Sequence, residues 1–167
     1  MNHPRRRATL TCLAAGLLTA ALPAVSAAAY PDKPIRLVVP FPPGQGADIL
    51  ARLIGQHLAA ALGQPIVVEN KVGAGGIIGT AFAAKAAPDG YTLYMGSSGP
   101  LAIGPHVYKA VGFDTLKDFA PISNIASVTQ VLVTAPASQL ASAKDVVERA
   151  RAQPGMVPFG SAGSGTT

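Results

Sequence analysis

Two glycine-rich segments carry the residues best suited to bind a ligand, and each lies between a predicted strand and a predicted helix. They occupy residues 39–48 and 157–167. The first turn of a helix leaves backbone N–H groups without partners and adds the positive end of the helix dipole, so it favours a carboxylate or phosphate without needing Arg or Lys. Glycine also lets a ligand approach the backbone closely. The segments predict an anion-binding site, and the alternative is that they are only tight strand-to-helix turns.

The spacing of the glycines argues against the nucleotide-binding and hydrolase motifs that glycine loops often signify. Ile49 and Ile78 stand where the third glycine of a dinucleotide-binding fingerprint belongs. No loop continues into the Gly-Lys-Ser/Thr of a phosphate-binding P-loop. Ser98 has Gly96 before it but Pro100 after it, so it does not form the Gly-x-Ser-x-Gly elbow of a serine hydrolase.

Histidine, cysteine and carboxylate side chains give no sign of catalysis or of a metal centre. After the N-terminal segment the histidines are His57 and His106, which stand alone in the sequence, and no second ligand lies at metal-binding spacing. The single cysteine, Cys12, lies in that N-terminal segment, so disulfides, thiolate metal sites and cysteine nucleophiles are excluded from the rest of the chain. We therefore expect no cofactor and no metal, and we expect that the protein is not an enzyme.

The first 29 residues have the three-part order of a secretory signal peptide. Arg5–Arg7 form a cationic start, residues 8–22 are uncharged and apolar, and an Ala-rich stretch follows Pro23. The apolar stretch is short for a spanning helix, although an uncleaved membrane anchor is the alternative. We expect cleavage between Ala27 and Tyr30, by the general or the twin-arginine export route, and a periplasmic location.

Loss of this segment lowers the net charge from +5 to +2, because it removes three arginines and leaves ten Lys and Arg against eight Asp and Glu. The remaining cations are scattered, with no run or stripe, so a nucleic-acid partner is not expected.

Apolar runs alternate with helical patterns along the next part of the chain. Strands are predicted at residues 35–39, 66–70 and 91–95, and helices at 48–62 and 77–86. This order implies an α/β fold with a parallel sheet and right-handed crossovers.

The pattern is less regular towards the C-terminus. Residues 97–105 read as a loop with short polar side chains, and 131–134 and 157–159 read as strands. A helix is predicted at 142–153, where Ser142 is the N-cap and Asp145 takes the third position of a capping box.

An ordered set of short segments resembles one known family. The segments are 30–44 (YPDKPIRLVVPFPPG), 48–52 (DILAR), 62–65 (LGQP), 68–70 (VEN), 73–79 (GAGGIIG), 87–93 (APDGYTL) and 117–122 (KDFAPI). Their order resembles the start of mature Bug-type (TctC-like) receptors, the substrate-binding proteins of tripartite tricarboxylate transporters. The resemblance covers essentially the whole chain after the signal peptide.

The resemblance implies a type II periplasmic-binding-protein fold, in which two α/β lobes enclose a ligand cleft. Residues 30–126 would form the first lobe, nearly complete, and residues 127–167 the start of a second lobe. Family members are considerably longer, so the second lobe is expected to be truncated here, as a fragment or a shortened gene would be.

The resemblance also implies which residues bind the ligand, a small organic carboxylate in this family. They are Phe41, Pro42, Pro43, Gly44, Gln45, Gly46, Ala47 and Asp48 of the first loop, Ser97 and Ser98 of the same cleft, and Gly163, Ser164, Gly165, Thr166 and Thr167 of the second lobe. Backbone amides and water of the first loop would hold one carboxylate.

Three residues of the first loop, Gln45, Ala47 and Asp48, bear on how it would bind the ligand. Asp48 is expected to cap the helix or to organise the loop amides, because a direct contact with a carboxylate would be repulsive. Gln45 and Ala47 depart from the glycine and the hydroxyl residue that are usual in the family, and Gln45 would narrow the pocket or add a polar contact.

Three functions follow from these observations. The leading one is a periplasmic receptor that captures a small carboxylate and presents it to membrane permease subunits of the transporter. The alternatives are an exported α/β enzyme acting on a small acid, and an orphan receptor that feeds a sensor kinase. Binding without turnover separates the receptor from the enzyme.

Overall fold

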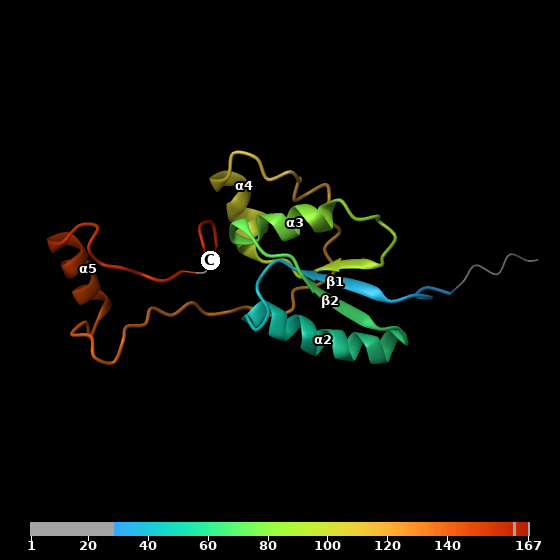
Figure 1. The fold of residues 1–167 in the computed structure, drawn as a ribbon, viewed down its shortest axis with the longest axis horizontal. Helices are drawn as coiled ribbons and strands as arrows, with labels where there is room; N and C mark the ends of the chain where they lie inside the picture. Colours follow the sequence, from blue (N-terminus) through green and yellow to red (C-terminus); the bar gives the residue numbers. More distant parts are fainter. Residues whose placement is uncertain (1–28, 162, 167) are drawn as a thin grey trace, which may run out of the picture. The chain divides into compact units, whose positions relative to one another are not determined.

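The computed structural model describes residues 29–161 and 163–166. The chain divides into two compact units, Met1–Asp32 and Lys33–Thr167. Of the first unit only residues 29–32 are described, and they form neither helix nor strand. The expected signal peptide, Ala29 apart, therefore lies outside the described residues, and so do Cys12 and Thr167. The α/β fold belongs to the second unit (Figure 1).

The sheet has three parallel strands in the order β2-β1-β3. They are β1 (Ile35–Val39), β2 (Ile66–Asn70) and β3 (Thr92–Tyr94). Val39 and Asn70 are register partners at the carboxyl ends of the two neighbouring strands β1 and β2. The parallel sheet expected from the sequence is confirmed, and the loops that follow β1 and β2 consequently leave the sheet at the same edge.

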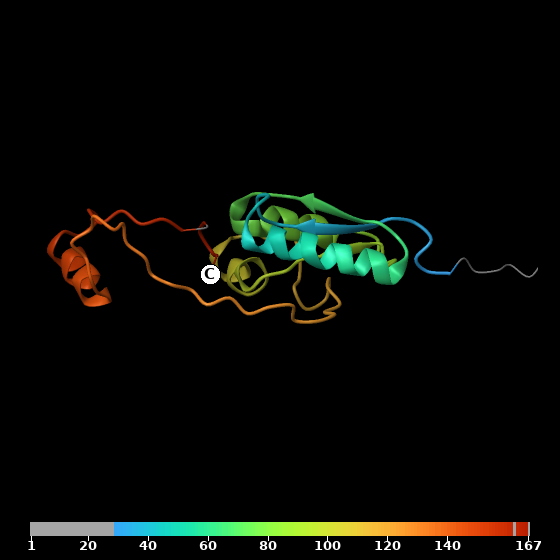
Figure 2. The same cartoon turned by 90° about the horizontal axis from the view of Figure 1, so that it is seen from below.

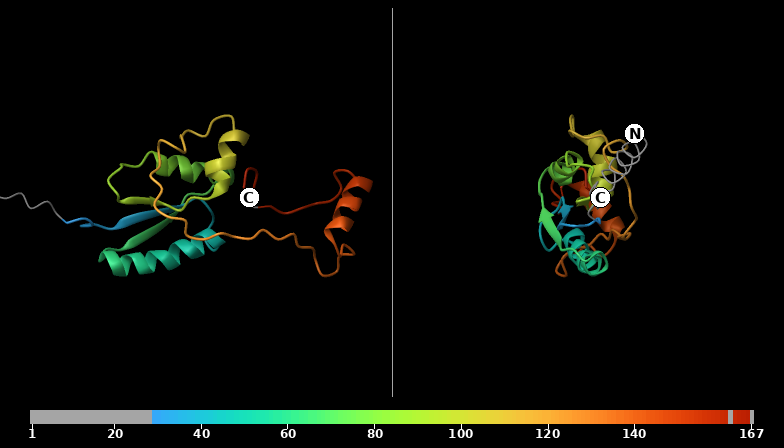
Figure 3. Two further views of the ribbon diagram at one scale, coloured as in Figure 1. Left: turned by 180° about the vertical axis from the view of Figure 1, so that it is seen from behind. Right: turned by 90° about the vertical axis from the view of Figure 1, so that its right-hand side faces the viewer.

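Two helices cover opposite faces of the sheet (Figures 1 and 3). Helix α2 (Gly46–Leu62) follows β1, and its residues Ala47, Ala51 and Ile54 pack against a core of Leu37, Val39 and Met95. Helix α3 (Ile77–Ala84) follows β2 and contacts the other face.

On that second face Thr80 of α3 is fully buried. Its hydroxyl lies 2.8 Å from the carbonyl of Gly76 and 2.5 Å from the hydroxyl of Tyr94. Because Val38 and Val39 point to alternate faces and are both fully buried, β1 is the centre of the core.

The segment predicted as a loop at residues 97–105 is mostly helical, and that prediction is wrong. A π-helical turn, η2 (Gly99–Ile103), leads directly into the short helix α4 (Gly104–Val107). The short polar side chains of Ser97 and Ser98 suggest a loop, but the residues that follow, at 99–107, are mostly apolar and form helical turns. Pro100 is fully buried, and its ring lies 3.1 Å from an ideal Cβ built on Gly76.

The strands predicted at residues 131–134 and 157–159 are also wrong. A strand needs a hydrogen-bonded neighbour, and no segment of the described chain pairs with either one. Val131, Leu132 and Val133 are 71–77% exposed, and Phe159 is 88% exposed. Residues 119–135 form neither helix nor strand (Figure 2).

The helix predicted after Ser142 is confirmed as α5 (Ala143–Ala152). Its capping box is complete, because the Ser142 hydroxyl accepts from the Asp145 N–H and the Asp145 carboxylate accepts from the Ser142 N–H.

No helix within residues 29–161 and 163–166 combines the length and the apolar character that crossing a membrane requires.

Candidate functional site

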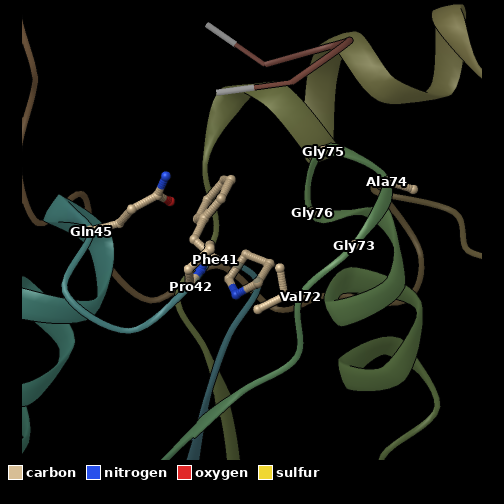
Figure 4. Close-up of a pocket in the computed structure, with 9 residues that line it drawn as sticks. Phe41, Pro42, Gln45, Val72, Gly73, Ala74, Gly75 and Gly76 are labelled. Carbon is tan, nitrogen blue, oxygen red and sulfur yellow. The ribbon is translucent and has the colours of Figure 1, made fainter. Parts of the chain in front are cut away.

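A cleft of about 240 Å³ opens at the edge of the sheet where β1 and β2 end. Its walls come from two chain segments, residues 40–45 after β1 and residues 72–76 after β2 (Figure 4). The lining residues are Pro40, Phe41, Pro42, Gln45, Val72, Gly73, Ala74, Gly75 and Gly76. A crevice at the carboxyl ends of parallel strands is the usual place for a ligand in an open α/β sheet.

The first wall runs directly into the N-terminus of α2. Gly44 has a φ of 83°, in the left-handed region that favours glycine. Gln45 is the N-cap, and its side chain makes no capping hydrogen bond. Within the described residues the N–H groups of Gly46, Ala47 and Asp48 have no backbone acceptor, as expected for a first helical turn. These donors and the helix dipole provide a positive potential at this end of the cleft.

Hydrogen bonds to the Asp48 carboxylate fix the conformation of the first wall. Its carboxylate, in a residue that is only 2% exposed, accepts from the Gly44 N–H at 2.9 Å and from Arg52 at 3.0 Å on each oxygen. The Asn70 amide donates to the same carboxylate and to the Phe41 carbonyl, both at 2.9 Å. Each Asp48 oxygen therefore accepts two hydrogen bonds, which uses the capacity of a carboxylate. Of the two roles expected for Asp48, the structure shows a hydrogen bond to a loop amide, that of Gly44.

These contacts also fix the charge of Asp48. The hydrogen bonds from Arg52, and then those from Gly44 and Asn70, hold the pKa of the Asp48 carboxyl well below its usual range. The pKa of the Arg52 guanidinium is raised by the same pair. Both side chains are therefore ionised at neutral pH.

The second wall has an unusual backbone. Gly73, Ala74, Gly75 and Gly76 all have positive φ, and the value for Ala74 is 47°. A run of such residues is costly for any side chain larger than hydrogen, and strained backbone of this kind is concentrated at binding sites. The turn is closed by the Gly76 N–H, which donates to the Gly73 carbonyl at 3.0 Å.

Residues 163–166 of the second glycine-rich segment lie against this second wall. An ideal Cβ on Gly75 would lie 2.5 Å from the Ser164 carbonyl oxygen. The Tyr108 hydroxyl donates to the same oxygen at 2.9 Å, and the Thr166 hydroxyl donates to the Gly163 carbonyl at 2.6 Å. A side chain at residue 75 would therefore push this segment away.

The structure brings together some of the expected site residues and leaves others apart. Phe41, Pro42 and Gln45 line the cleft, whereas Pro43, Gly44, Gly46, Ala47 and Asp48 belong to the same wall without being lining residues. Gly163, Ser164 and Thr166 lie close to Gly75, Gly165 lies close to Tyr108 and Val107, and Thr167 is not described. Ser97 and Ser98 follow β3 and are not lining residues; the Ser97 carbonyl accepts from the Leu101 N–H at 3.2 Å.

Sequence reasoning missed the second wall and the partners of Asp48. A glycine loop after β2 is visible in the sequence, and its place beside the first loop follows once β1 and β2 are neighbours. Arg52 stands four residues after Asp48, the spacing of a helical ion pair, yet in the sequence it looks like one of the scattered cations. Asn70 gives no local signal, because its role depends on the register of β2 with β1.

The histidines take no part in this cleft. His57 lies within α2 and His106 within α4, and neither lines the cleft. Among residues 29–161 and 163–166 there is no group of three His, Cys, Asp or Glu side chains that could hold a metal ion.

The chain matches the model of a known protein family. The model of the tripartite tricarboxylate transporter family receptor (TctC) matches residues 50–167. Protein BugT of Bordetella pertussis is 46% identical over 136 residues, which make up 81% of this chain and 42% of BugT. The chain spans about half the length of the curated relatives it matches.

Solved structures with the same fold include periplasmic proteins and carboxylate complexes. A periplasmic transporter has a TM-score of 0.75 and 44% identity, over 81% of this chain and 45% of its own. An R. palustris protein with adipate has a TM-score of 0.77 and 35% identity, over 82% and 46% of the two chains. MatC from Rhodopseudomonas palustris, with bound malate, has a TM-score of 0.55 and 38% identity, over 57% and 33%.

Proposed function

Since the chain belongs to the tripartite tricarboxylate transporter receptor family, we propose that it works in the periplasm as the carboxylate-capturing part of a transporter. The family and the structural neighbours are solute-binding proteins, which are not enzymes, so the alternative of an exported enzyme is not supported. The expected α/β fold of periplasmic binding proteins is confirmed by the parallel sheet and by these neighbours.

The observation that carries the proposal is the cleft at the carboxyl ends of β1 and β2. Gln45, the N-cap of α2, lines this cleft, and the N–H groups of the next two residues, Gly46 and Ala47, have no backbone acceptor in the described chain. A carboxylate is the right size and charge for such donors. Among residues 29–161 and 163–166 no lysine or arginine lines the cleft, so the backbone itself would neutralise the ligand.

The chemical class of the ligand rests on the relatives. One neighbour binds adipate and another binds malate, and both compounds are small dicarboxylates. We propose a small dicarboxylate or a related organic acid for this protein, with one carboxylate at the start of α2.

The proposal includes the two-lobed arrangement expected from the sequence. Residues 30–126 would form the first lobe and residues 127–167 the start of the second. The loop 41–48, the serines at 97 and 98 and the loop 163–167 would then approach the ligand from both lobes. Residues 1–29 would be removed during export, and the loaded receptor would dock on membrane permease subunits.

The test is a calorimetric titration of the protein expressed from its complete gene. The panel is adipate, malate, a monocarboxylate and the uncharged diamide of adipate, each with and without a metal chelator. We expect saturable binding of at least one carboxylate, no binding of the diamide and no effect of the chelator. Equal binding of the diamide, or binding that the chelator abolishes, would contradict the proposal.

A further inference from the structure

The acidic residue at the start of α2 creates an electrostatic problem for any anion in the cleft. Asp48 occupies the first turn of the helix, close to the N–H groups of Gly46 and Ala47. A carboxylate in the first turn is itself stabilised by the helix dipole and reduces the positive potential that remains for a ligand. At neutral pH it is ionised, for the reasons given above, and it would repel a bound carboxylate.

Arg52 lies one helical turn further along α2 than Asp48. Its guanidinium binds the Asp48 carboxylate with two hydrogen bonds, Nε to Oδ2 and Nη2 to Oδ1, both 3.0 Å. It also donates to the Asn70 Oδ1 at 3.2 Å, so the amide of Asn70 is oriented with its NH₂ group towards Asp48 and Phe41. Arg52 does not line the cleft and its side chain is 51% exposed.

We propose that Arg52 is a positioning residue that makes the cleft competent for an anion by neutralising Asp48 and orienting Asn70, without touching the ligand. This inference rests on the proposed function, because it concerns how the same cleft binds a carboxylate. With the Asp48 charge compensated, the N–H groups at the start of α2 and the helix dipole remain available to the ligand. The planar guanidinium of Arg52 also fixes the orientation of the Asp48 carboxylate, which accepts a hydrogen bond from the Gly44 N–H.

The experiment compares three substitutions in the protein expressed from its complete gene, with adipate and malate as the titrants. Arg52→Gln removes the charge and leaves Asp48 uncompensated. Arg52→Lys keeps the positive charge but cannot make the paired guanidinium hydrogen bonds to the Asp48 carboxylate. Arg36→Gln is the matched control, since Arg36 is a 48% exposed arginine in an ion pair with Glu69 that lies outside the cleft.

We expect Arg52→Gln to weaken binding about 2- to 30-fold, the range that Coulomb's law gives for two like unit charges roughly 8 Å apart at effective dielectric constants of about 80 and about 20. The loss should shrink as ionic strength rises, because salt screens the repulsion. Arg52→Lys should keep most of the affinity, and Arg36→Gln should match the wild type.

A double substitution separates the charge effect from a loss of fold. In Asp48→Asn with Arg52→Gln both charges are gone, so affinity should recover relative to Arg52→Gln alone, although the double variant lacks the same ion pair. Unchanged affinity in Arg52→Gln, an equal loss in Arg36→Gln, or no recovery in the double variant would overturn the inference. If the wild type binds no carboxylate at all, the proposed function fails before any variant is compared.

Discussion

Replacement of Gly44 by valine tests the backbone geometry of the first wall. Gly44 has a φ of 83°, and an ideal Cβ at this position meets no atom within 4 Å. The added side chain therefore does not clash, and its cost comes from the backbone conformation alone. That cost is roughly 1–2 kcal/mol for an ordinary residue in the left-handed region and higher for a β-branched one.

The consequence for binding follows from the hydrogen bond that the Gly44 N–H donates to Asp48. In Gly44→Val, relaxation of the substituted residue to a negative φ would rotate the peptide that makes this bond and would displace the neighbouring amides. Because valine is β-branched, restoring the ligand-binding conformation would then cost at least about 1–2 kcal/mol, which corresponds to a loss of affinity of at least about 5- to 30-fold.

Gly63 provides the matched control. It has a φ of 68°, its ideal Cβ also meets no atom within 4 Å, and its N–H is likewise engaged, with the Ala59 carbonyl at 3.0 Å. It terminates the same helix at the end away from the cleft. Gly63→Val should destabilise the protein by a similar amount in urea unfolding and leave the affinity for dicarboxylates unchanged.

The assay is calorimetric titration of both variants with the best dicarboxylate of the wild-type protein, beside urea unfolding of each. We expect similar losses of stability and a loss of affinity in Gly44→Val alone. Wild-type affinity in Gly44→Val, or an equal loss of affinity in Gly63→Val, would refute the reasoning.

Three further predictions concern stability and processing. Thr80→Val leaves the Tyr94 hydroxyl, whose pKa burial raises to about 12, without its buried partner, so urea unfolding should show a loss of about 1–3 kcal/mol, reduced when Tyr94→Phe is added. The folded-state pKa of Asp48 is depressed, so the ionised carboxylate stabilises the fold above its unfolded pKa of about 3.9, and this stabilisation is lost as pH falls below that value towards the folded pKa. Melting temperatures measured from pH 7 to pH 3 should therefore fall more steeply for the wild type than for Asp48→Asn. Parallel curves would contradict this prediction. N-terminal sequencing of the periplasmic protein should find a start between residues 28 and 30, whereas a product that begins at Met1 or stays in the membrane would exclude cleavage.

The central α/β unit was predictable because local and tertiary preferences agree there. The segment 35–39, which is rich in Ile and Val, lies between Pro34 and Pro40, and the apolar face of residues 48–62 has helical periodicity and ends at Gly63. In the structure these signals are satisfied by mutual burial, with β1 enclosed between α2 and α3.

Prediction failed where distant contacts decide the conformation. Val131, Leu132 and Val133 have strand-forming side chains, but the described chain offers them no pairing partner. Residues 99–107 lack a strong helical pattern, yet Pro100 is buried near Gly76 and η2 leads into α4 there.

In the candidate site, too, local sequence predicts some features and distant contacts decide the others. The first wall was visible as a glycine loop before a helix, because its chemistry lies in consecutive residues. The second wall and Asn70 depend on β2 lying beside β1, which no local pattern reports. The ion pair of Arg52 with Asp48 could have been predicted from the sequence, since opposite charges four residues apart on a helix are a simple local signal.

A crystal structure of the protein from its complete gene with a bound dicarboxylate would test the proposed site most directly. We predict one carboxylate in the cleft between residues 40–45 and 72–76, with its oxygens within hydrogen-bonding distance of N–H groups at the start of α2 and with Asp48 still bound to Arg52. A carboxylate held by lysine or arginine side chains or by a metal ion, or a ligand bound away from the ends of β1 and β2, would contradict it.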